Sequence, residues 1–255
     1  MGFTPKEKCK KCAMFYDTGN FCAHLTPEEL ENLSNESRTA TLKRGESFEG
    51  EALEHWPIVA ISSGVLSLQH LLEDGRKSIA AFFMRGDVID LRRAGQRNRG
   101  SLIALSKAEV CRLSVDAFET IADTNHSAQH VIWDNLREQS FLSNDHAADL
   151  ATKQALEKLA SFLFECRYRG STDLPKQVIS IPIRRCDMAE YMGMQPETIS
   201  RGFRQLEEMG ILHMQDLKTV VLENEPALRR IANGARDISH ITADPKAKIK
   251  ILSFG

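Results

Sequence analysis

Three cysteines near the start of the sequence have a spacing suited to binding a metal or a cluster. Cys9, Cys12 and Cys22 form a C-x2-C-x9-C arrangement, and lysines surround the first pair. A C-x-x-C pair lets two thiolates converge on one centre, as zinc and iron–sulfur sites require. Few apolar residues are present to fold this segment alone, so a bound metal or cluster would have to order it.

A second stretch could bind nucleic acid. Residues 187–210, DMAEYMGMQPETISRGFRQLEEMG, predict a short helix that ends at Gly193 and a second helix with Pro196 at its first position. One face of the second helix is apolar. The opposite face carries Glu197, Ser200, Arg201 and Arg204, which together with Thr198 are the candidate DNA-binding residues. Two helices joined by a glycine turn, the second with a polar face, are typical of a helix-turn-helix.

The polar residues of this second helix have the chemistry to read base pairs. Arg201 can donate two hydrogen bonds to guanine, Glu197 can accept one from cytosine, and Ser200 can reach a neighbouring base. The three residues are spaced i, i+3 and i+4, so they share one stripe of the helix. We therefore expect sequence-specific DNA binding.

Length and composition allow two modest domains with real cores, because the chain has 255 residues, of which 42% are apolar. The net charge is −2, and charges also balance over residues 176–208. The DNA-binding prediction therefore depends on the motif and not on a basic patch. Without a membrane span or a leader, and with six cysteines, the chain is expected to be cytoplasmic and its thiols reduced.

Between the two candidate sites the pattern changes to short apolar segments separated by turns. Residues 41–118 predict a small antiparallel barrel or jelly roll, which turns at Gly45, Gly64, Gly75 and Gly86. Helices are expected at 26–36 and 155–167, a strand at 178–183, and a hairpin at 213–222. A polar tail with a helix at 226–232 ends the sequence.

One long helix is predicted over residues 126–149. Its loosely heptad-like stripe could pair with a second copy of the chain, or it could be an ordinary core-facing stripe. The proposed dimerisation residues on this stripe are Val131, Leu136, Ser140 and Ser143, and Trp133 and Phe141 lie near them. Two serines in the seam would make the pairing weak, as suits a dimer that forms only when a signal stabilises it.

The motif ETISR at Glu197–Arg201 resembles the recognition helix of the FNR-like subgroup of Crp/Fnr transcription regulators, and Ile58–Ile89 resembles the effector domain of that family. The resemblance implies an α+β chain with a cyclic-nucleotide-binding-type β-roll, a long dimerisation helix and a winged helix-turn-helix. The expected parts are a cysteine arm (1–24), the β-roll (25–122), the dimerisation helix (123–150), the DNA-binding domain (151–224) and a tail (225–255).

The resemblance also implies a function for the cysteines. Cys111 lies where FNR-like proteins have the distant fourth ligand of a 4Fe–4S cluster, which would make Cys9, Cys12, Cys22 and Cys111 the metal ligands. Such a protein senses oxygen, binds an inverted TTGAT-like repeat as a homodimer at low oxygen, and contacts RNA polymerase, here around Leu72–Lys77. The nine-residue gap before Cys22 exceeds the five or seven usual in that subgroup.

Cyclic AMP is not expected as a ligand. Members of the family that bind it have Gly-Glu in a short helix and then Arg-Ser or Arg-Ala, whereas this chain has Asp87 after Gly86 and Gly100 after Arg99. The arginines at 92–99 could hold another anion, although a solvated loop is the simpler interpretation.

Other interpretations remain open. The chain could be a cluster-less FixK-like regulator, or a haem- or nitric-oxide-responsive one with His24, His55 or His70 as ligands. A C-x-x-C thiol oxidoreductase is a remote alternative, because the pair precedes strands of a roll and not an α/β fold. We predict a regulator and no enzyme, with Cys166 and Cys186 structural and reduced.

Overall fold

A computed structural model describes residue 9, residues 12–47, 55–92 and 100–169, residue 175 and residues 177–235. The chain divides into two compact units, Met1–Ser143 and Asn144–Gly255. The division falls inside the long helix α5 (His126–Thr152), which was predicted from its sequence pattern.

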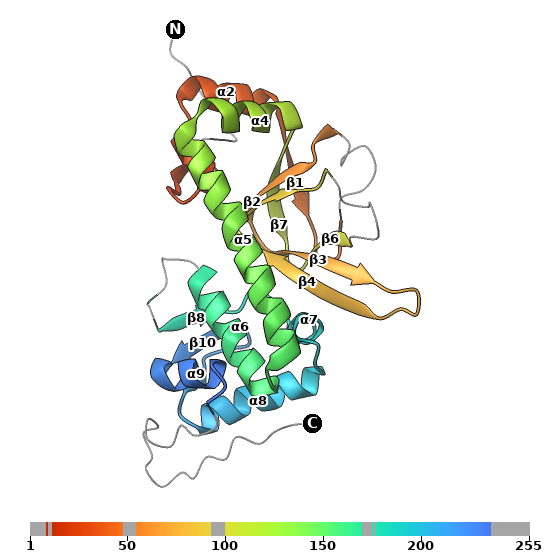
Figure 1. Cartoon of the computed structure of the whole chain (residues 1–255), viewed down its shortest axis with the longest axis vertical. Helices are drawn as coiled ribbons and strands as arrows, with labels where there is room; N and C mark the ends of the chain where they lie inside the picture. Colours follow the sequence, from red (N-terminus) through yellow and green to blue (C-terminus); the bar gives the residue numbers. More distant parts are fainter. Residues whose placement is uncertain are drawn as a thin grey trace. The chain divides into compact units, whose positions relative to one another are not determined.

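The first unit contains two antiparallel sheets (Figure 1). One sheet has the strand order β1-β7-β2-β5 and the other has the order β4-β3-β6. The strands are β1 (Ser37–Leu42), β2 (Ile58–Ser63), β3 (Leu66–Leu71), β4 (Lys77–Phe83), β5 (Val88–Asp90), β6 (Ser101–Ala104) and β7 (Ala108–Leu113).

Both faces of the four-stranded sheet are covered, and alternation along β2 shows this directly. Val59 and Ile61 pack in a core with residues of the other sheet, such as Leu66 and Leu102. Ile58 and Ala60 point the other way, into a second core formed with helical segments. Because successive residues of a strand point to opposite faces, a strand buried on both sides must be apolar throughout, as IVAI is.

The glycines predicted to mark turns of the roll do so. Gly45, Gly64, Gly75 and Gly86 all have positive φ angles. Gly64 must be glycine for two reasons. Its φ of 84° lies in the left-handed region, and an added Cβ would lie 2.3 Å from the backbone oxygen of Lys107. The β2–β3 turn therefore packs backbone to backbone against the start of β7.

Short helical segments build the second core of this unit. They are η1 (Ala13–Tyr16), η2 (Phe21–His24), α2 (Pro27–Asn35), α4 (Val115–Thr124) and the first half of α5. The predicted start of α2 is confirmed, since Thr26 and Glu29 form a capping box. Helices α2 and α4 lie side by side (Figure 1).

The second unit combines helices with a small sheet. Its elements are α6 (Ala155–Arg169), β8 (Val178–Ser180), α7 (Arg185–Met192), α8 (Pro196–Glu208), β9 (Leu212–Met214), β10 (Thr219–Leu222) and α9 (Glu225–Ala232). The sheet has the order β8-β10-β9, so the predicted hairpin is present and β8 adds a third strand. The expected strand at 178–183 ends earlier, at Ser180.

The predicted fold class is confirmed: the chain is α+β, with a β-roll, a long helix and a winged helix-turn-helix. Within the described ranges, no helix combines the length and the apolar character needed to cross a membrane. The end of the predicted tail, residues 236–255, lies outside the described residues, as do most of the loop arginines at 92–99.

Candidate functional site

The turn between α7 and α8 is built by local hydrogen bonds. The Arg184 amide donates to Asp187 Oδ2 at 3.1 Å, which starts α7. Gly193 ends that helix in the left-handed region (φ 63°, ψ 40°), and the Met194 amide then donates to Ala189 O at 2.9 Å. This αL ending reverses the chain within a few residues, so that α7 packs against α8.

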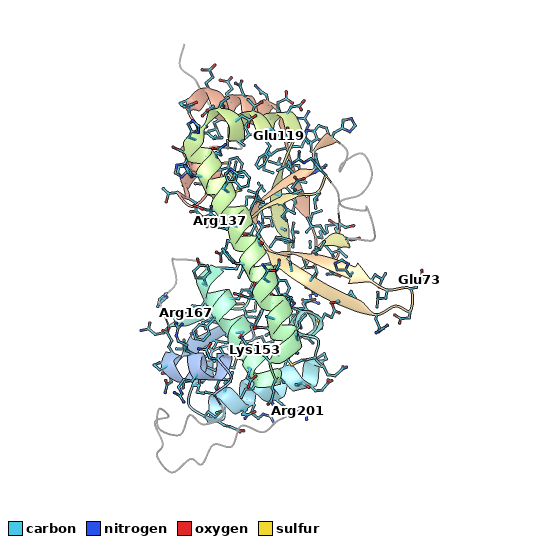
Figure 2. All side chains as sticks on the ribbon, in the orientation of Figure 1. Glu73, Glu119, Arg137, Lys153, Arg167 and Arg201 are labelled. Carbon is cyan, nitrogen blue, oxygen red and sulfur yellow. The ribbon has the colours of Figure 1, made fainter. Side chains whose placement is uncertain are left out.

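Helix α8 separates its apolar and polar residues as the sequence predicts. Its buried residues are Ile199, Gly202, Phe203 and Leu206. The four charged or hydroxyl-bearing candidates Glu197, Ser200, Arg201 and Arg204 are exposed, and Thr198 is half-buried. Figure 2 labels Arg201, whose Nε donates to the Glu197 carbonyl at 3.4 Å. A recognition helix needs one apolar face that packs on its own domain and an opposite polar face that is free to enter a DNA groove, and α8 has both.

Two residues that sequence reasoning did not select hold α8 in place. A Cβ on Gly202 would lie 2.8 Å from Leu159 Cδ2, so α6 and α8 approach closely at this point. The Arg185 guanidinium lies over the Phe203 ring, 3.4 Å from its centroid. Burial lowers the pKa of Arg185 to about 10, which still leaves it charged at neutral pH. A glycine inside an amphipathic helix was the available signal for Gly202.

The hairpin β9–β10 is tied to the end of α8. Glu207 Oε1 accepts hydrogen bonds from the Met214 amide at 3.0 Å and contacts His213 Nδ1 at 2.9 Å. The turn falls at the predicted residues, where the Asp216 carboxylate accepts the Lys218 amide. The hydrogen bond from the Lys218 amide, and after it the one from the Thr219 side chain, hold the pKa of the Asp216 carboxyl below its usual value. The carboxylate therefore stays an acceptor across the neutral range.

The four predicted metal ligands gather against one core. Cys9, Cys12, Cys22 and Cys111 are all half-buried and pack against the same apolar cluster of the first unit. Cys111 reaches it from β7, paired with Thr39 on one side and Ala60 on the other. Burial raises the pKa of Cys22, and the nearby Cys111, Cys12 and Cys9 thiols raise it further. Residues far apart in the sequence therefore meet in one place.

The four thiols do not form a site for a single metal ion in the described part of the chain. Among the described residues, no group of three or more His, Cys, Asp or Glu side chains is close enough to hold one metal ion. Each iron of a 4Fe–4S cluster takes one thiolate, so its four ligands surround a larger body and lie farther apart. Cys166 is buried in α6 and Cys186 is exposed in α7, and both belong to the second unit.

The predicted dimerisation residues fall into two groups. Leu136, Ser140 and Ser143 are exposed on α5, whereas Val131 is half-buried and packs against the core of its own unit. Trp133 and Phe141 are each 59% exposed. Large exposed apolar side chains on one helix are typical of a protein–protein contact surface.

The family model of the Crp-like helix-turn-helix domain matches residues 157–231, which include α7, α8 and the hairpin. The nitrogen fixation regulation protein FixK of Bradyrhizobium diazoefficiens is 28% identical over 209 residues, 80% of this chain and 85% of that protein. The fumarate and nitrate reduction regulatory protein of Escherichia coli K12 is 26% identical over 226 residues, 84% and 87% respectively.

Solved structures agree with these sequence matches. FixK2 from Bradyrhizobium japonicum has a TM-score of 0.64 at 27% identity and covers 76% of this chain and 96% of its own. A CooA mutant from Carboxydothermus hydrogenoformans also has a TM-score of 0.64, covering 78% and 88%, but at 18% identity it supports the fold alone. The relatives with printed functions are regulators, not enzymes.

Proposed function

We propose that this chain, which belongs to the Crp/Fnr family of DNA-binding transcription regulators, senses oxygen through a 4Fe–4S cluster and binds an inverted DNA repeat as a homodimer. The observation that carries the proposal is the gathering of Cys9, Cys12, Cys22 and Cys111 against one apolar cluster. Four thiols from an N-terminal arm and a distant strand are a complete ligand set for such a cluster.

On DNA, the exposed face of α8 enters the major groove. Arg201 donates to guanine, Glu197 accepts from cytosine, and Ser200 and Thr198 contact neighbouring positions of a TTGAT-like half-site. Arg204, one turn further along, contacts the phosphate backbone. In a dimer, the two copies of α8 lie about one turn of DNA apart, which matches an inverted repeat.

The thiolates of the arm and of β7 hold the arm to the sheet. When bound, the cluster supplies an oxygen-labile link between these two parts of the chain. With the arm held, η1 and η2 stay packed on the core that also contains Ala128 and Ile132 of α5. The exposed stripe of α5 that contains Trp133, Leu136 and Phe141 is then presented to a second copy.

Further partners follow from the same assignment. The β3–β4 hairpin carries exposed Leu71 and Leu72, and its Arg76 pairs with Asp74 at 2.8 Å, so it offers RNA polymerase an apolar and charged tip. The Asp87 carboxylate accepts the Met84 amide at 2.7 Å and stabilises a turn, a role that suits a roll without cyclic AMP. A regulator of this kind acts where its DNA is, in the cytoplasm.

The first test is an absorption spectrum, with iron and sulfide analysis, of protein purified without oxygen. We expect a broad visible band, about four irons per chain and bleaching in air, as for a cysteine-held cluster. DNA binding to an inverted repeat should fall in parallel. A sharp Soret band would instead indicate haem, with His24, His55 or His70 as the ligands to examine.

A second candidate function is a regulator that binds the same DNA without a cluster. The similarity to FixK favours it, since that match covers 80% of this chain, nearly as much as the 84% covered by the match to the fumarate and nitrate regulator. Colourless, iron-free protein that still binds the inverted repeat would establish this function and remove the oxygen-sensing proposal.

A further inference from the structure

The loop between Cys12 and Cys22 contains a buried asparagine that uses both ends of its side chain. Asn20 is only 1% exposed. Its Oδ1 accepts the Cys22 amide at 3.3 Å and so starts η2. Its Nδ2 donates to the carbonyl oxygen of Gly86 at 3.2 Å. The backbone of Cys22 is therefore tied, through one amide group, to the turn between β4 and β5.

The same carbonyl is bonded to helix α5. Asn135 Nδ2 donates to Gly86 O at 3.4 Å, so this oxygen accepts from both asparagines. A carbonyl oxygen has two lone pairs and can take both bonds. Gly86 has a φ of 97°, a conformation that suits glycine and turns its carbonyl toward the two amides.

The other end of Asn135 is held at the edge of the sheet. Strand β5 is the last strand of its sheet, and Val88 within it bonds to α5 instead of to a further strand. The Val88 amide donates to Asn135 Oδ1 at 3.0 Å, and the Val88 carbonyl accepts from Gln139 Nε2 at 2.9 Å. Gln139 also donates to Asn135 Oδ1 at 2.7 Å. One turn of α5 is thus fastened to β5 by side chains.

These bonds form a continuous path from a cysteine to the exposed side of α5. Leu136 and Ser140, the residues that follow Asn135 and Gln139, are exposed on the stripe proposed for dimerisation. If the Cys22 amide moves, the buried Oδ1 of Asn20 loses its hydrogen-bond donor. A buried amide group without a hydrogen-bond partner is unfavourable, so the Asn20 side chain must reposition. Because Asn20 and Asn135 share the Gly86 carbonyl, the Gly86 turn and Asn135 adjust with it.

We propose that Asn20 and Asn135 are positioning residues that transmit the state of the four-cysteine site to α5 through the shared Gly86 carbonyl. This inference rests on the proposed function. Neither asparagine is a ligand, and their contribution is to link the position of Cys22 to the orientation of one helical turn.

The test uses two nearly isosteric variants of the full chain. Asn20→Asp keeps the oxygen that accepts the Cys22 amide, and Asn135→Asp keeps the oxygen that accepts Val88 and Gln139. Each replaces the amide donor that faces Gly86 O by a carboxylate oxygen and adds one negative charge. The dimer dissociation constant is measured by analytical ultracentrifugation, without oxygen, for iron-loaded protein and for protein stripped of iron.

In the wild-type protein, stripping iron should weaken the dimer. Both variants should keep the wild-type iron and sulfide content, while the ratio between stripped and loaded dissociation constants falls about tenfold. The double variant should fall no further, since both changes break one path. Asn35→Asp, the same change at an exposed position of α2, is the control and should keep the wild-type ratio.

A wild-type ratio in either single variant would overturn the inference, as would loss of iron from Asn135→Asp, which would make the residue a support of the metal site only. If wild-type protein holds no iron, the proposed function fails separately. The path is then tested by the rate at which iodoacetamide alkylates Cys22. Faster alkylation in Asn135→Asp than in Asn35→Asp supports the link, and equal rates overturn it.

Discussion

The imidazole ring of His146, on α5, stacks on the phenol ring of Tyr191, on α7, with centroids 3.7 Å apart and planes 3° apart. The Tyr191 hydroxyl donates to Glu165 Oε2 on α6 at 2.9 Å, and Arg169 donates to the other oxygen of that carboxylate. Burial raises the pKa of Tyr191, and the Glu165 charge raises it further, so the hydroxyl remains a donor. The end of α5 is thereby joined to the first helix of the helix-turn-helix.

This stack should make the DNA-binding unit sensitive to mild acid. Burial lowers the pKa of His146 below its usual 6.5, and Lys158 lowers it while Asp149 raises it. Among the described residues, His146 Nε2 is buried without a hydrogen-bond partner. Because the unfolded chain binds the proton more readily, stability is full above pH 6.5 and falls as the pH decreases toward the lowered pKa.

The pH effect is checked by urea unfolding at pH 7.5 and 5.5. His146→Phe keeps an aromatic ring on Tyr191 and removes the titrating nitrogen, so it should lose less stability between the two pH values than the wild type. His126→Phe, the same change at an exposed position of α5, is the control. An identical acid sensitivity in wild type and His146→Phe would assign the effect to other groups.

Arginines 201 and 204 should have different effects on DNA binding. Arg201→Ala should reduce discrimination between a TTGAT-like repeat and random DNA by about 1–3 kcal/mol, because a base contact is lost. Arg204→Ala should weaken binding to both DNAs alike and lower the salt dependence by about one counterion. Fluorescence anisotropy over a series of salt concentrations distinguishes them. Selective binding by Arg201→Ala protein would refute the base-reading assignment.

Cys111→Ser should remove the cluster and leave the fold intact. The side chain is half-buried beside Thr39 and Ala60, so a hydroxyl can be accommodated there, whereas a serine is a poor iron ligand. Iron analysis and circular dichroism of anaerobic protein measure both effects. Cys186→Ser, at an exposed thiol of α7, should retain iron. Normal iron content in Cys111→Ser would return Cys111 to a packing role.

Gly64 and Gly75 provide a matched pair for stability, since both have a φ of 84°. Gly75→Ala meets no atom within 4 Å and should cost only the backbone strain, about 1–2 kcal/mol. Gly64→Ala also drives a Cβ into the Lys107 carbonyl and Ala108, so its cost should be clearly larger. Urea unfolding of both variants checks this. Equal losses would show that the β2–β3 turn can move away.

Leu136→Glu should weaken the proposed dimer. Leu136 is 37% exposed on α5 near Trp133, and a carboxylate there would be desolvated in a paired helix while remaining solvated in the monomer. Sedimentation equilibrium of iron-loaded protein should show a shift toward monomer of at least about tenfold in the dissociation constant. Leu71→Glu, on the β3–β4 hairpin, is the control. An unchanged dimer would place the interface elsewhere.

The sequence by itself determined the elements whose signals are local. Gly193 and Pro196 mark the end of α7 and the start of α8, and the spacing of apolar residues separates the two faces of α8. The capping box at Thr26 and the glycine turns of the roll are local as well. Such features depend on φ preferences and on hydrogen bonds between near neighbours, which composition and spacing express directly.

Only the tertiary structure decided which distant residues meet. Alternation along β7 indicates the face on which Cys111 lies, but strand order and register bring that face to the core that also receives Cys9, Cys12 and Cys22. The meeting of Asn20 and Asn135 at one carbonyl has no sequence pattern at all. Contacts of this kind depend on how whole elements pack, and packing is a property of the assembled core and not of any single segment.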